Sequence, residues 1–346
     1  MEEQTVLIIG GGIAGLSAAA DLAKTGIRSL IIEKTPYLGG FAAQYACKAT
    51  TACVKCGACV VDEKMQQVVD NPNIEILAES QIRQIDRNGR FAAEIEQQKN
   101  GTAERIIRQV DAVIVATGFK PFDPCSKPYG YEEFSNVMTS LELECMLRQN
   151  SIAARPSDDR PPRNIAFFQC VGSRDATLGH LWCSKICCAS SLRMSRLIKI
   201  RQPDTEITFF YIDVQTFGKE FDNFYQDVQK EVKMVRIIPG DIYPAENDCL
   251  KVIYYDARMQ ENCEEQFDLV VLSIGITPST ENLPLAGLLQ LDTGEDGFID
   301  LVETGKHPAP PGVFAAGTAC GPMTIAESVA SAGQAAMAAA TYLRSR

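Results

Sequence analysis

The sequence predicts an α/β protein of two domains, each built on a parallel sheet, with the second domain inserted into the first. Three observations lead to this prediction. A glycine-rich turn joins an apolar strand to a helix within residues 5–24. An apolar strand pattern at residues 111–121 returns at residues 268–278. The chain has 346 residues, enough for about two domains of ordinary size.

Composition and charge exclude several classes of partner. The net charge is −11, and an acidic surface repels the phosphates of nucleic acids. The longest apolar run, residues 5–20, contains consecutive glycines and is too short to span a bilayer. Residues 1–3 are acidic where a secretory signal would be basic. We therefore expect a cytoplasmic protein without a membrane span that does not bind nucleic acid.

The first strand and turn have the pattern of a dinucleotide site. Residues 5–9 are apolar, as in a strand buried on both faces, and residues 16–24 have a helical pattern. Between them, Gly10, Gly12 and Gly15 form G-x-G-x-x-G. The first glycine permits a tight turn, the second lets backbone N–H groups approach a pyrophosphate, and the third lets the helix pack on the strand.

An acidic residue follows the second strand at the expected spacing. The strand at residues 29–32 ends at Glu33, 18 residues after Gly15. A carboxylate at this point accepts hydrogen bonds from a ribose 2′-OH and repels a 2′-phosphate. Strand, helix, spacing and acid together predict a dinucleotide site.

Two further segments favour FAD over NAD as the dinucleotide. Gly39-Gly40 follows Glu33 closely, and residues 312–318 resemble the second FAD fingerprint of flavoproteins with two dinucleotide-binding domains. Pro322 opens an alanine-rich helix, expected at about residues 323–343, whose N-terminus would stabilise a reduced, anionic flavin ring. The residues expected to bind FAD are Gly10, Gly12, Ile13, Ala14, Gly15, Glu33, Lys34, Gly39, Gly40, Thr117, Gly118, Gly317, Thr318, Met323 and Thr324.

The internal repeat indicates how the two domains are connected. Residues 111–121 and 268–278 share Asp, Val, Gly and Pro at matching offsets. Such a repeat is similar to the arrangement in the thioredoxin reductase and glutathione reductase superfamily. We expect a discontinuous FAD-binding domain at residues 1–120 and 276–346, and an inserted Rossmann-like domain at residues 121–275.

The inserted domain has no second nucleotide fingerprint. Its first strand, residues 164–169, is followed by Cys170-Val171-Gly172-Ser173-Arg174, with a single glycine. A cysteine therefore stands where a phosphate-binding turn is expected, and we predict that NAD(P)H does not bind here.

Cysteine is the most unusual feature of the composition. There are 13 cysteines and only two histidines, His180 and His307, so thiols outnumber imidazoles as metal ligands. In a reducing compartment such cysteines are metal ligands or redox groups more often than disulfides. Eight fall into two quartets: the first quartet is Cys47, Cys53, Cys56 and Cys59, and the second quartet is Cys170, Cys183, Cys187 and Cys188.

Either quartet has the ligand number of an iron–sulfur cluster. The C-x2-C-x2-C rhythm of the first quartet resembles that of ferredoxins, without the closing Cys-Pro. In the second quartet, a helix would put Cys183 and Cys187 on one face and turn Cys188 away. The alternative for both is that some are small buried apolar residues. Five isolated cysteines are expected to be structural, with a redox role held open only for Cys320: Cys125, Cys145, Cys249, Cys263 and Cys320.

The whole chain resembles the flavin and iron–sulfur A subunits of the heterodisulfide reductase family. The segments that carry this resemblance are Cys56–Cys59, Lys64-Met65, Asn71–Ile74, Tyr129–Tyr131, Asn136–Glu142, Gln169–Asp175, Trp182–Cys188, Phe217–Glu220 and Gly321–Val329. The repeated C-x2-C-x2-C-x3-C-P runs of the methanogen-type protein are absent. The size is similar to that of the short A subunits of a heterodisulfide reductase-like complex of sulfur oxidation.

The resemblance implies cofactors, partners and a preferred cluster site. It implies FAD, a [4Fe–4S] cluster, subunits of the B and C type as partners, and a homodimer when isolated. The second quartet matches the position where the family carries a cluster with adjacent cysteines. Cys56 and Cys59 resemble cysteines that serve a cluster shared with an additional N-terminal domain, although a second cluster on the first quartet stays open.

Three functions follow as hypotheses. The leading one is an oxidoreductase subunit that stores electrons on FAD and passes them through a cluster to partners. The second is an NAD(P)H-dependent disulfide oxidoreductase of the thioredoxin reductase type, for which Cys56 and Cys59 are the candidate redox pair. The third is an assembly module that bears a cluster and a structural flavin.

Overall fold

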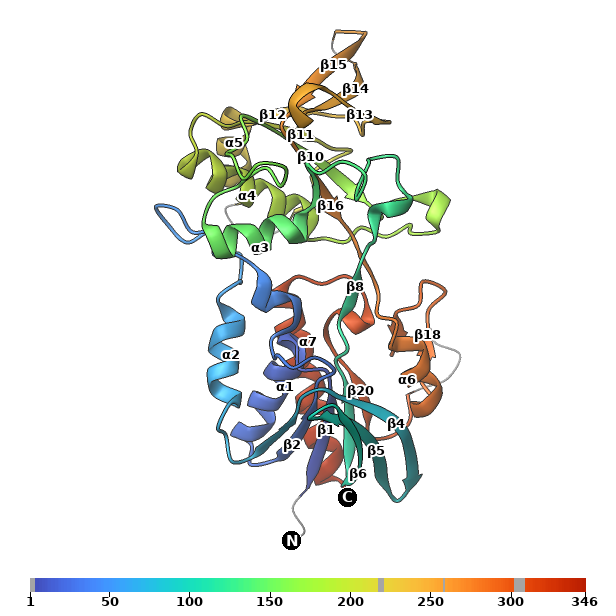
Figure 1. Ribbon diagram of the computed structural model, residues 1–346. Helices are drawn as coiled ribbons and strands as arrows, with labels where there is room; N and C mark the ends of the chain where they lie inside the picture. The colour runs from blue at the N-terminus through green and yellow to red at the C-terminus, as the bar shows by residue number, and fades with distance from the viewer. Residues whose placement is uncertain (1–3, 217–220, 258, 302–308) are drawn as a thin grey trace. The chain divides into compact units, whose positions relative to one another are not determined.

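The computed structural model describes residues 4–216, 221–257, 259–301 and 309–346 (Figure 1). The segment Phe217–Glu220, which contributes to the family resemblance, and His307 lie outside the described residues. The chain divides into two compact units. Unit 1 contains residues 1–43, 57–120 and 277–346, and unit 2 contains residues 44–56 and 121–276.

Unit 1 is built on a five-stranded parallel sheet with the order β20-β7-β1-β2-β3. The central strand β1 is buried because apolar side chains cover both of its faces, and residues 6–8 are fully enclosed. Its strands are β1 (Thr5–Ile9), β2 (Arg28–Ile32), β3 (Ile74–Leu77), β7 (Ala112–Val115) and β20 (Val313–Ala315).

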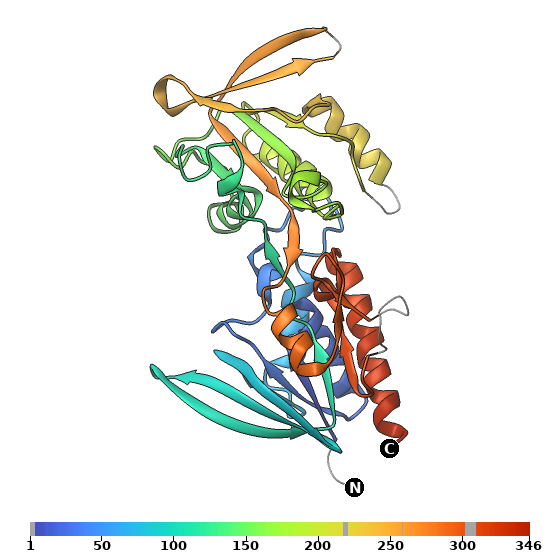
Figure 2. The same ribbon diagram turned by 90° about the vertical axis from the view of Figure 1, so that its right-hand side faces the viewer.

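Different elements cover the two faces of this sheet. On one face, α1 (Ile13–Lys24) and α7 (Ile325–Arg344) pack side by side through small alanine side chains, with α2 (Val60–Val68) next to α1 (Figure 1). On the other face lie α6 (Asn282–Leu289) and the antiparallel strands β4 (Ser80–Asn88), β5 (Arg90–Lys99) and β6 (Thr102–Val110) (Figure 2). The short pair β18 (Asp292–Thr293) and β19 (Ile299–Asp300) completes the unit.

Unit 2 repeats this design with a second five-stranded parallel sheet, ordered β12-β11-β10-β16-β9. Aromatic side chains of its central strands fill the core on both sides. Its strands are β9 (Val137–Thr139), β10 (Asn164–Val171), β11 (Glu206–Phe210), β12 (Lys233–Val235) and β16 (Leu269–Ile274), and its helices are α3 (Ser140–Asn150), α4 (Cys187–Arg201) and α5 (Phe221–Glu231).

A three-stranded antiparallel sheet packs on the second core of unit 2. Its strands are β13 (Ile242–Pro244), β14 (Leu250–Asp256) and β15 (Glu261–Phe267). The chain passes between the units in β8 (Phe119–Pro121) and β17 (Ile276–Pro278), which pair with each other. No helix of the described residues is long and apolar enough to cross a membrane.

The sequence repeat corresponds to equivalent hydrogen bonds in the two sheets. Asp111 accepts a bond from the backbone N–H of Thr5 at 2.9 Å, at the start of β1. Asp268 accepts one from the backbone N–H of Asn164 at 3.0 Å, at the start of β10. In each unit the repeated strand therefore begins with a carboxylate that aligns it with its central neighbour, and the predicted α/β fold class is confirmed.

Two local expectations differ from the structure. Residues 44–56 group with unit 2, although we expected all of residues 1–120 in the first domain. The alanine-rich helix begins at Ile325 instead of residue 323, because the side chain of Thr324 caps it. A threonine at this position satisfies the free N–H groups of the first turn, so Pro322 lies before the helix rather than in it.

Candidate functional site

The three fingerprint glycines of unit 1 have the geometry of a phosphate-binding turn. Gly10 has a φ of +113°, which favours glycine, and a Cβ there would stand 2.3 Å from the carbonyl oxygen of Ala116. A Cβ on Gly15 would stand 1.9 Å from the oxygen of Gly10. A Cβ on Gly12, by contrast, would meet no atom within 4 Å. The first and third glycines serve packing, and the second leaves open space at the N-terminus of α1.

Glu33 stabilises this turn through hydrogen bonds to its backbone. Its Oε2 accepts the backbone N–H of Gly11 at 2.8 Å, and its Oε1 accepts both the N–H and the hydroxyl of Thr35 at 2.8 Å. The side chain is buried. Each carboxylate oxygen has more than one acceptor direction, so Glu33 can still accept a ribose hydroxyl. Lys34, which we expected in the same site, is exposed.

The second glycine-rich segment lies beside the first. A Cβ on Gly317 would stand 2.7 Å from the Cβ of Ala14 in the first turn of α1. A Cβ on Gly118 would stand 3.8 Å from the hydroxyl oxygen of Thr318. Unit 1 therefore brings segments from three distant parts of the sequence to one edge of its sheet.

The loop after β2 joins the same edge. Gly39 forms an isolated bridge with Gly12, and its backbone N–H donates to the oxygen of Gly11 at 2.8 Å. A Cβ on Gly40 would stand 3.3 Å from the Cα of Gly12. The carboxyl edge of a parallel sheet is where such folds bind their ligands. Open space at Gly12, glycines that allow close approach and an acid at the end of β2 fit a dinucleotide such as FAD.

The last two expected contacts lie at the start of α7. Thr324 and Glu327 form a capping box: the hydroxyl of Thr324 accepts the N–H of Glu327 at 3.2 Å, and Glu327 accepts the N–H of Thr324 at 2.8 Å. Met323 is half-buried next to the cap. Thr324 thus has a structural role that the sequence analysis did not assign to it.

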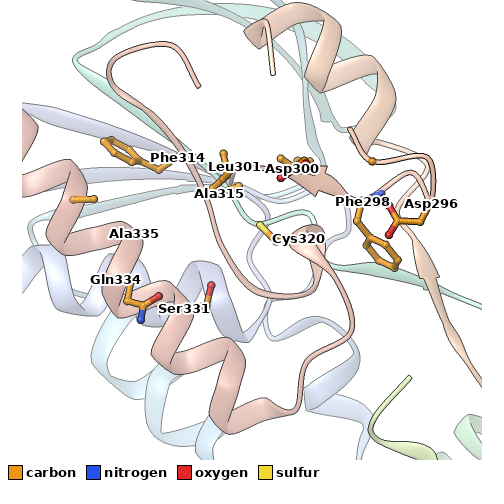
Figure 3. Close-up of a pocket in the computed structure, with 13 residues that line it drawn as sticks. Asp296, Phe298, Asp300, Leu301, Phe314, Ala315, Cys320, Ser331, Gln334 and Ala335 are labelled. Atoms are coloured by element: carbon orange, nitrogen blue, oxygen red, sulfur yellow. Dashed lines mark hydrogen bonds between the residues drawn. The ribbon is translucent and has the colours of Figure 1, made fainter. Parts of the chain in front are cut away.

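A cavity of about 500 Å³ in unit 1 is separate from these glycines (Figure 3). Cys320 lies in its wall, with Ser331 and Gln334 from α7 nearby and Asp300 above. Burial and then the charge of Asp300 raise the pKa of the Cys320 thiol to about 11. None of the fingerprint glycines lines the cavity. One lining residue, Leu301, is followed in the chain by residues outside the described part. We assign it no ligand.

The second quartet lies around the carboxyl end of β10 in unit 2. Cys170 is the next-to-last residue of the strand, at an irregularity between Phe168 and Val171, and has a φ of +61°. A residue other than glycine adopts this conformation at an energetic cost, and bulges of this kind redirect a side chain next to functional sites. Cys187 and Cys188 begin the first turn of α4.

The predicted helical relationship between Cys183 and Cys187 is wrong. Cys183 lies in the loop before α4, because Lys185 has a φ of +63° and Ser184 is turned inward, where its hydroxyl accepts the N–H of Ile276 at 2.8 Å. A left-handed residue interrupts the helical path. Cys183 therefore reaches the other three thiols from a loop.

The four thiols of the second quartet influence one another. Burial, followed by the proximity of Cys188, raises the pKa of Cys170 to about 12, and the charge of Arg174 opposes this. Burial and the other three thiols raise the pKa of Cys187 well above its ordinary value. Their donor chemistry fits an iron–sulfur cluster, which takes four thiolates. Among the described residues, however, no three His, Cys, Asp or Glu side chains stand in a metal-ligating arrangement.

The first quartet is divided between the units. Cys47, Cys53 and Cys56 lie in the segment that belongs to unit 2, whereas Cys59 precedes α2 of unit 1. Cys56 is half-buried and the other three are exposed. Cys53 and Cys56 lie near Arg193 of α4, since their charge acts to raise the pKa of that guanidinium, which burial lowers.

The turn after β10 does not have the form of a phosphate cradle. Gly172 is covered by the ring of Phe122, whose atoms a Cβ would meet at 2.0 Å. The following loop folds on itself through a bridge between Asp175 and His180, and the helix begins only at Cys187. A dinucleotide site needs an open glycine turn that leads directly into a helix. This loop provides neither.

Several residues of this region were missed by the sequence analysis. Glu144 of α3 forms a buried ion pair with Lys48, and Arg174 pairs with Asp213 beside the second quartet. Glu144 had a detectable signal, because it lies between Leu143 and Leu147 on the apolar side of α3, where a carboxylate needs a partner. Asp213 had no such signal in the sequence, because it lies in a loop and only the folded chain brings Arg174 next to it.

Comparisons with known proteins agree with this architecture. Residues 4–150 match the family described as pyridine nucleotide-disulphide oxidoreductase. The chain is 31% identical to the iron-sulfur A subunit of CoB–CoM heterodisulfide reductase from Methanocaldococcus jannaschii, over 97% of this chain and 64% of that protein. It is 29% identical to the A subunit of H2:CoB–CoM heterodisulfide, ferredoxin reductase from Methanothermobacter thermautotrophicus, over 98% of this chain and 64% of that protein.

Solved structures share the fold at low sequence identity. Thioredoxin reductase of T. acidophilum superposes with a TM-score of 0.63 at 19% identity, over 99% of both chains. Thioredoxin reductase of Lactococcus lactis gives a TM-score of 0.64 at 18% identity, over 99% of this chain and all of the other. The fold is therefore that of the thioredoxin reductase-like flavoproteins.

This chain spans just under two thirds of the length of the two heterodisulfide reductase relatives, and they match nearly all of it. The similarity thus extends through both units and both quartets, well beyond the segment that the oxidoreductase family covers. Along nearly its whole length, the chain is similar to the A subunits of heterodisulfide reductases.

Proposed function

We propose that this chain is an FAD- and [4Fe–4S]-containing electron-transfer component of a heterodisulfide reductase-like complex in sulfur metabolism. The observation that carries the proposal is the second quartet, which replaces a nucleotide turn at the carboxyl end of the central strand β10. When bound, FAD takes up electrons in pairs and releases them singly, and a cluster carries one electron at a time.

Unit 1 supplies the residues that would hold FAD. The N–H groups at the start of α1, next to the open space at Gly12, would bind the pyrophosphate. Glu33 would accept the hydroxyls of the adenosine ribose, and Thr318 would lie along the ribityl chain. The N-terminus of α7 would direct its positive dipole end toward the flavin ring.

Unit 2 supplies the residues that would hold the cluster: Cys170, Cys183, Cys187 and Cys188. Backbone N–H groups reach two of these sulfurs: that of Lys185 donates to the sulfur of Cys183 at 3.3 Å, and that of Gln215 lowers the pKa of Cys188 against the larger effect of burial. Hydrogen bonds of this kind to sulfur tune iron–sulfur clusters. The first quartet is the weaker candidate, because three of its four cysteines are exposed.

A second candidate function is that of an NAD(P)H-dependent disulfide oxidoreductase, favoured by the family that residues 4–150 match. The turn at Gly172, covered by Phe122, disfavours it. We therefore expect that NADH or NADPH does not bleach the flavin of the anaerobic protein, whereas dithionite does. Steady turnover of NADH with an artificial acceptor would favour the second function instead.

The relatives are named as A subunits of reductases, which supports partner subunits for this chain, and the family resemblance implies that these are of the B and C type. Because this chain spans only part of those relatives, such partners, a homodimer of the isolated protein and the sulfur substrate are parts of the proposal. A cytoplasmic location agrees with the 13 cysteines, all of which are free thiols.

The test is to count iron and record the visible and reduced EPR spectra of protein purified without oxygen. Two matched variants locate the cluster, since Cys187→Ala and Cys56→Ala each remove one thiol from one quartet. We expect Cys187→Ala to lose the [4Fe–4S] signal and Cys56→Ala to keep it. A full signal in Cys187→Ala together with its loss in Cys56→Ala would move the cluster to the first quartet, and absence of iron from the parent protein would refute the proposal.

A further inference from the structure

Arg174 and Asp213 form an ion pair beside the second quartet. Nη2 of Arg174 donates to Oδ2 of Asp213 at 3.1 Å, and Nη1 donates to Oδ1. This bidentate geometry fixes the guanidinium more firmly than a single contact would. The pair is only partly exposed, at 27% for the arginine side chain and 34% for the aspartate.

Both residues are tied to the loops that carry the cysteines. The backbone N–H of Arg174 donates to the oxygen of Trp182 at 3.0 Å, one residue before Cys183. The sulfur of Cys188 lies 3.8 Å from the backbone oxygen of Asp213, which accepts from it. The ion pair therefore keeps its place relative to the thiols through the backbone.

Backbone geometry places both charges beside the thiols. Arg174 lies in the turn that follows Cys170 at the end of β10, and its backbone bonds to the residue before Cys183. The backbone of Asp213 contacts the sulfur of Cys188. Asp213, whose pKa Arg174 holds down, contributes the opposite charge at nearly the same place.

We propose that Arg174 and Asp213 set the reduction potential of a cluster held by the second quartet, with Arg174 raising it and Asp213 lowering it. The inference rests on the proposed function. One-electron reduction adds one negative charge among four thiolates, so a nearby cation stabilises the reduced form and a nearby anion destabilises it. A second cation, Arg236, lies near Asp213 and donates from Nε to the oxygen of Ile212 at 2.9 Å.

Opposite signs distinguish this role from a structural one. If the pair only held the loops together, removing either partner would disturb the cluster in the same way. An electrostatic role requires that Arg174→Gln lower the midpoint potential and that Asp213→Asn raise it. Each change should alter the equilibrium constant for reduction by about five- to tenfold, and by less at high salt.

The experiment is an anaerobic redox titration of the full chain, followed by EPR, with iron counted in every variant. The matched control is Lys233→Gln, which breaks a different cation–carboxylate pair of unit 2, Lys233 with Glu265 at 2.7 Å. We expect no shift in the control, and a potential near that of the parent in the double variant. Arg174→Lys, which keeps the charge, should lie between the parent and Arg174→Gln.

Failure of the inference is distinguishable from failure of the proposed function. A parent protein without a cluster would refute both. A parent with a cluster whose potential stays the same in Arg174→Gln and Asp213→Asn, or moves in the same direction in both, would overturn this inference alone. If Arg174→Gln loses iron, the midpoint potentials of Arg174→Lys and Asp213→Asn are compared with that of the parent instead.

Discussion

Lys48 and Glu144 form an ion pair that is almost completely enclosed in unit 2. The Nζ–Oε2 distance is 2.7 Å, and the two side chains are 3% and 4% exposed. Glu144 also accepts the N–H of Ala46 at 3.0 Å and the hydroxyl of Ser190 at 2.7 Å. One carboxylate of α3 thus holds both the segment of the first quartet and the first turns of α4, next to the second quartet.

Breaking this pair should destabilise unit 2. Lys48→Met and Glu144→Gln each leave a buried charge without its partner, at a cost of about 3–5 kcal/mol. We expect an earlier urea transition for each, and a double variant that loses less than the sum of the single changes. Lys230→Ala, in the exposed pair with Asp227, is the control and should leave the transition in place. Strictly additive losses would contradict a coupled pair.

Two glycines of the first turn should behave differently when replaced by alanine. Gly15→Ala places a methyl group 1.9 Å from the oxygen of Gly10, so the backbone must move and the protein should unfold earlier on heating. Gly12→Ala meets nothing within 4 Å, so it should fold as the parent does but bind less flavin, because the methyl group occupies the phosphate space. Melting curves and the flavin-to-protein ratio measure the two effects. Full flavin in Gly12→Ala would refute this phosphate site.

Glu33→Ala should weaken the retention of FAD. The change removes the acceptor for the ribose and also the bond that holds the N–H of Gly11. The absorbance ratio of flavin to protein after gel filtration measures the loss. Glu94→Ala removes a half-buried acid, paired with the exposed Arg105 on the antiparallel sheet of unit 1, and should keep the parent ratio. Full flavin occupancy in Glu33→Ala would refute the assignment of Glu33 to the ribose.

Cys320 should be a poor nucleophile near neutral pH. Burial and Asp300 raise the pKa of its thiol to about 11, so the reactive thiolate is scarce below that value and increases about tenfold for each pH unit toward it. Iodoacetamide labelling of the native protein, followed by mass spectrometry of the peptide with Cys320, measures this profile. Unfolded protein should label readily at about pH 8. Rapid labelling of the native protein at the same pH would restore a redox role for Cys320.

The turn at Gly10–Gly15 could be predicted because the sequence pattern that defines it is local, although Gly10 also packs against Ala116. Strand, turn and helix follow one another within residues 5–24, and the clash that requires glycine at position 15 is with Gly10. The start of α4 could not be predicted as well. Residues 183–188 are compatible with a helix, but Ser184 is held by the N–H of Ile276, which is 92 positions away in the sequence.

By itself, the sequence determined the fold class, the similarity to heterodisulfide reductase A subunits, the repeat of the two sheets and the presence of eight cysteines in two quartets. These depend on residue types at fixed short spacings and on strand patterns that are visible without the fold. Only the tertiary structure decided that the segment of Cys47 belongs to unit 2, that Glu144 is enclosed with Lys48, and that Arg174 faces Asp213. Burial and ion pairing arise between residues that are distant in the chain, and only the packed protein brings them together.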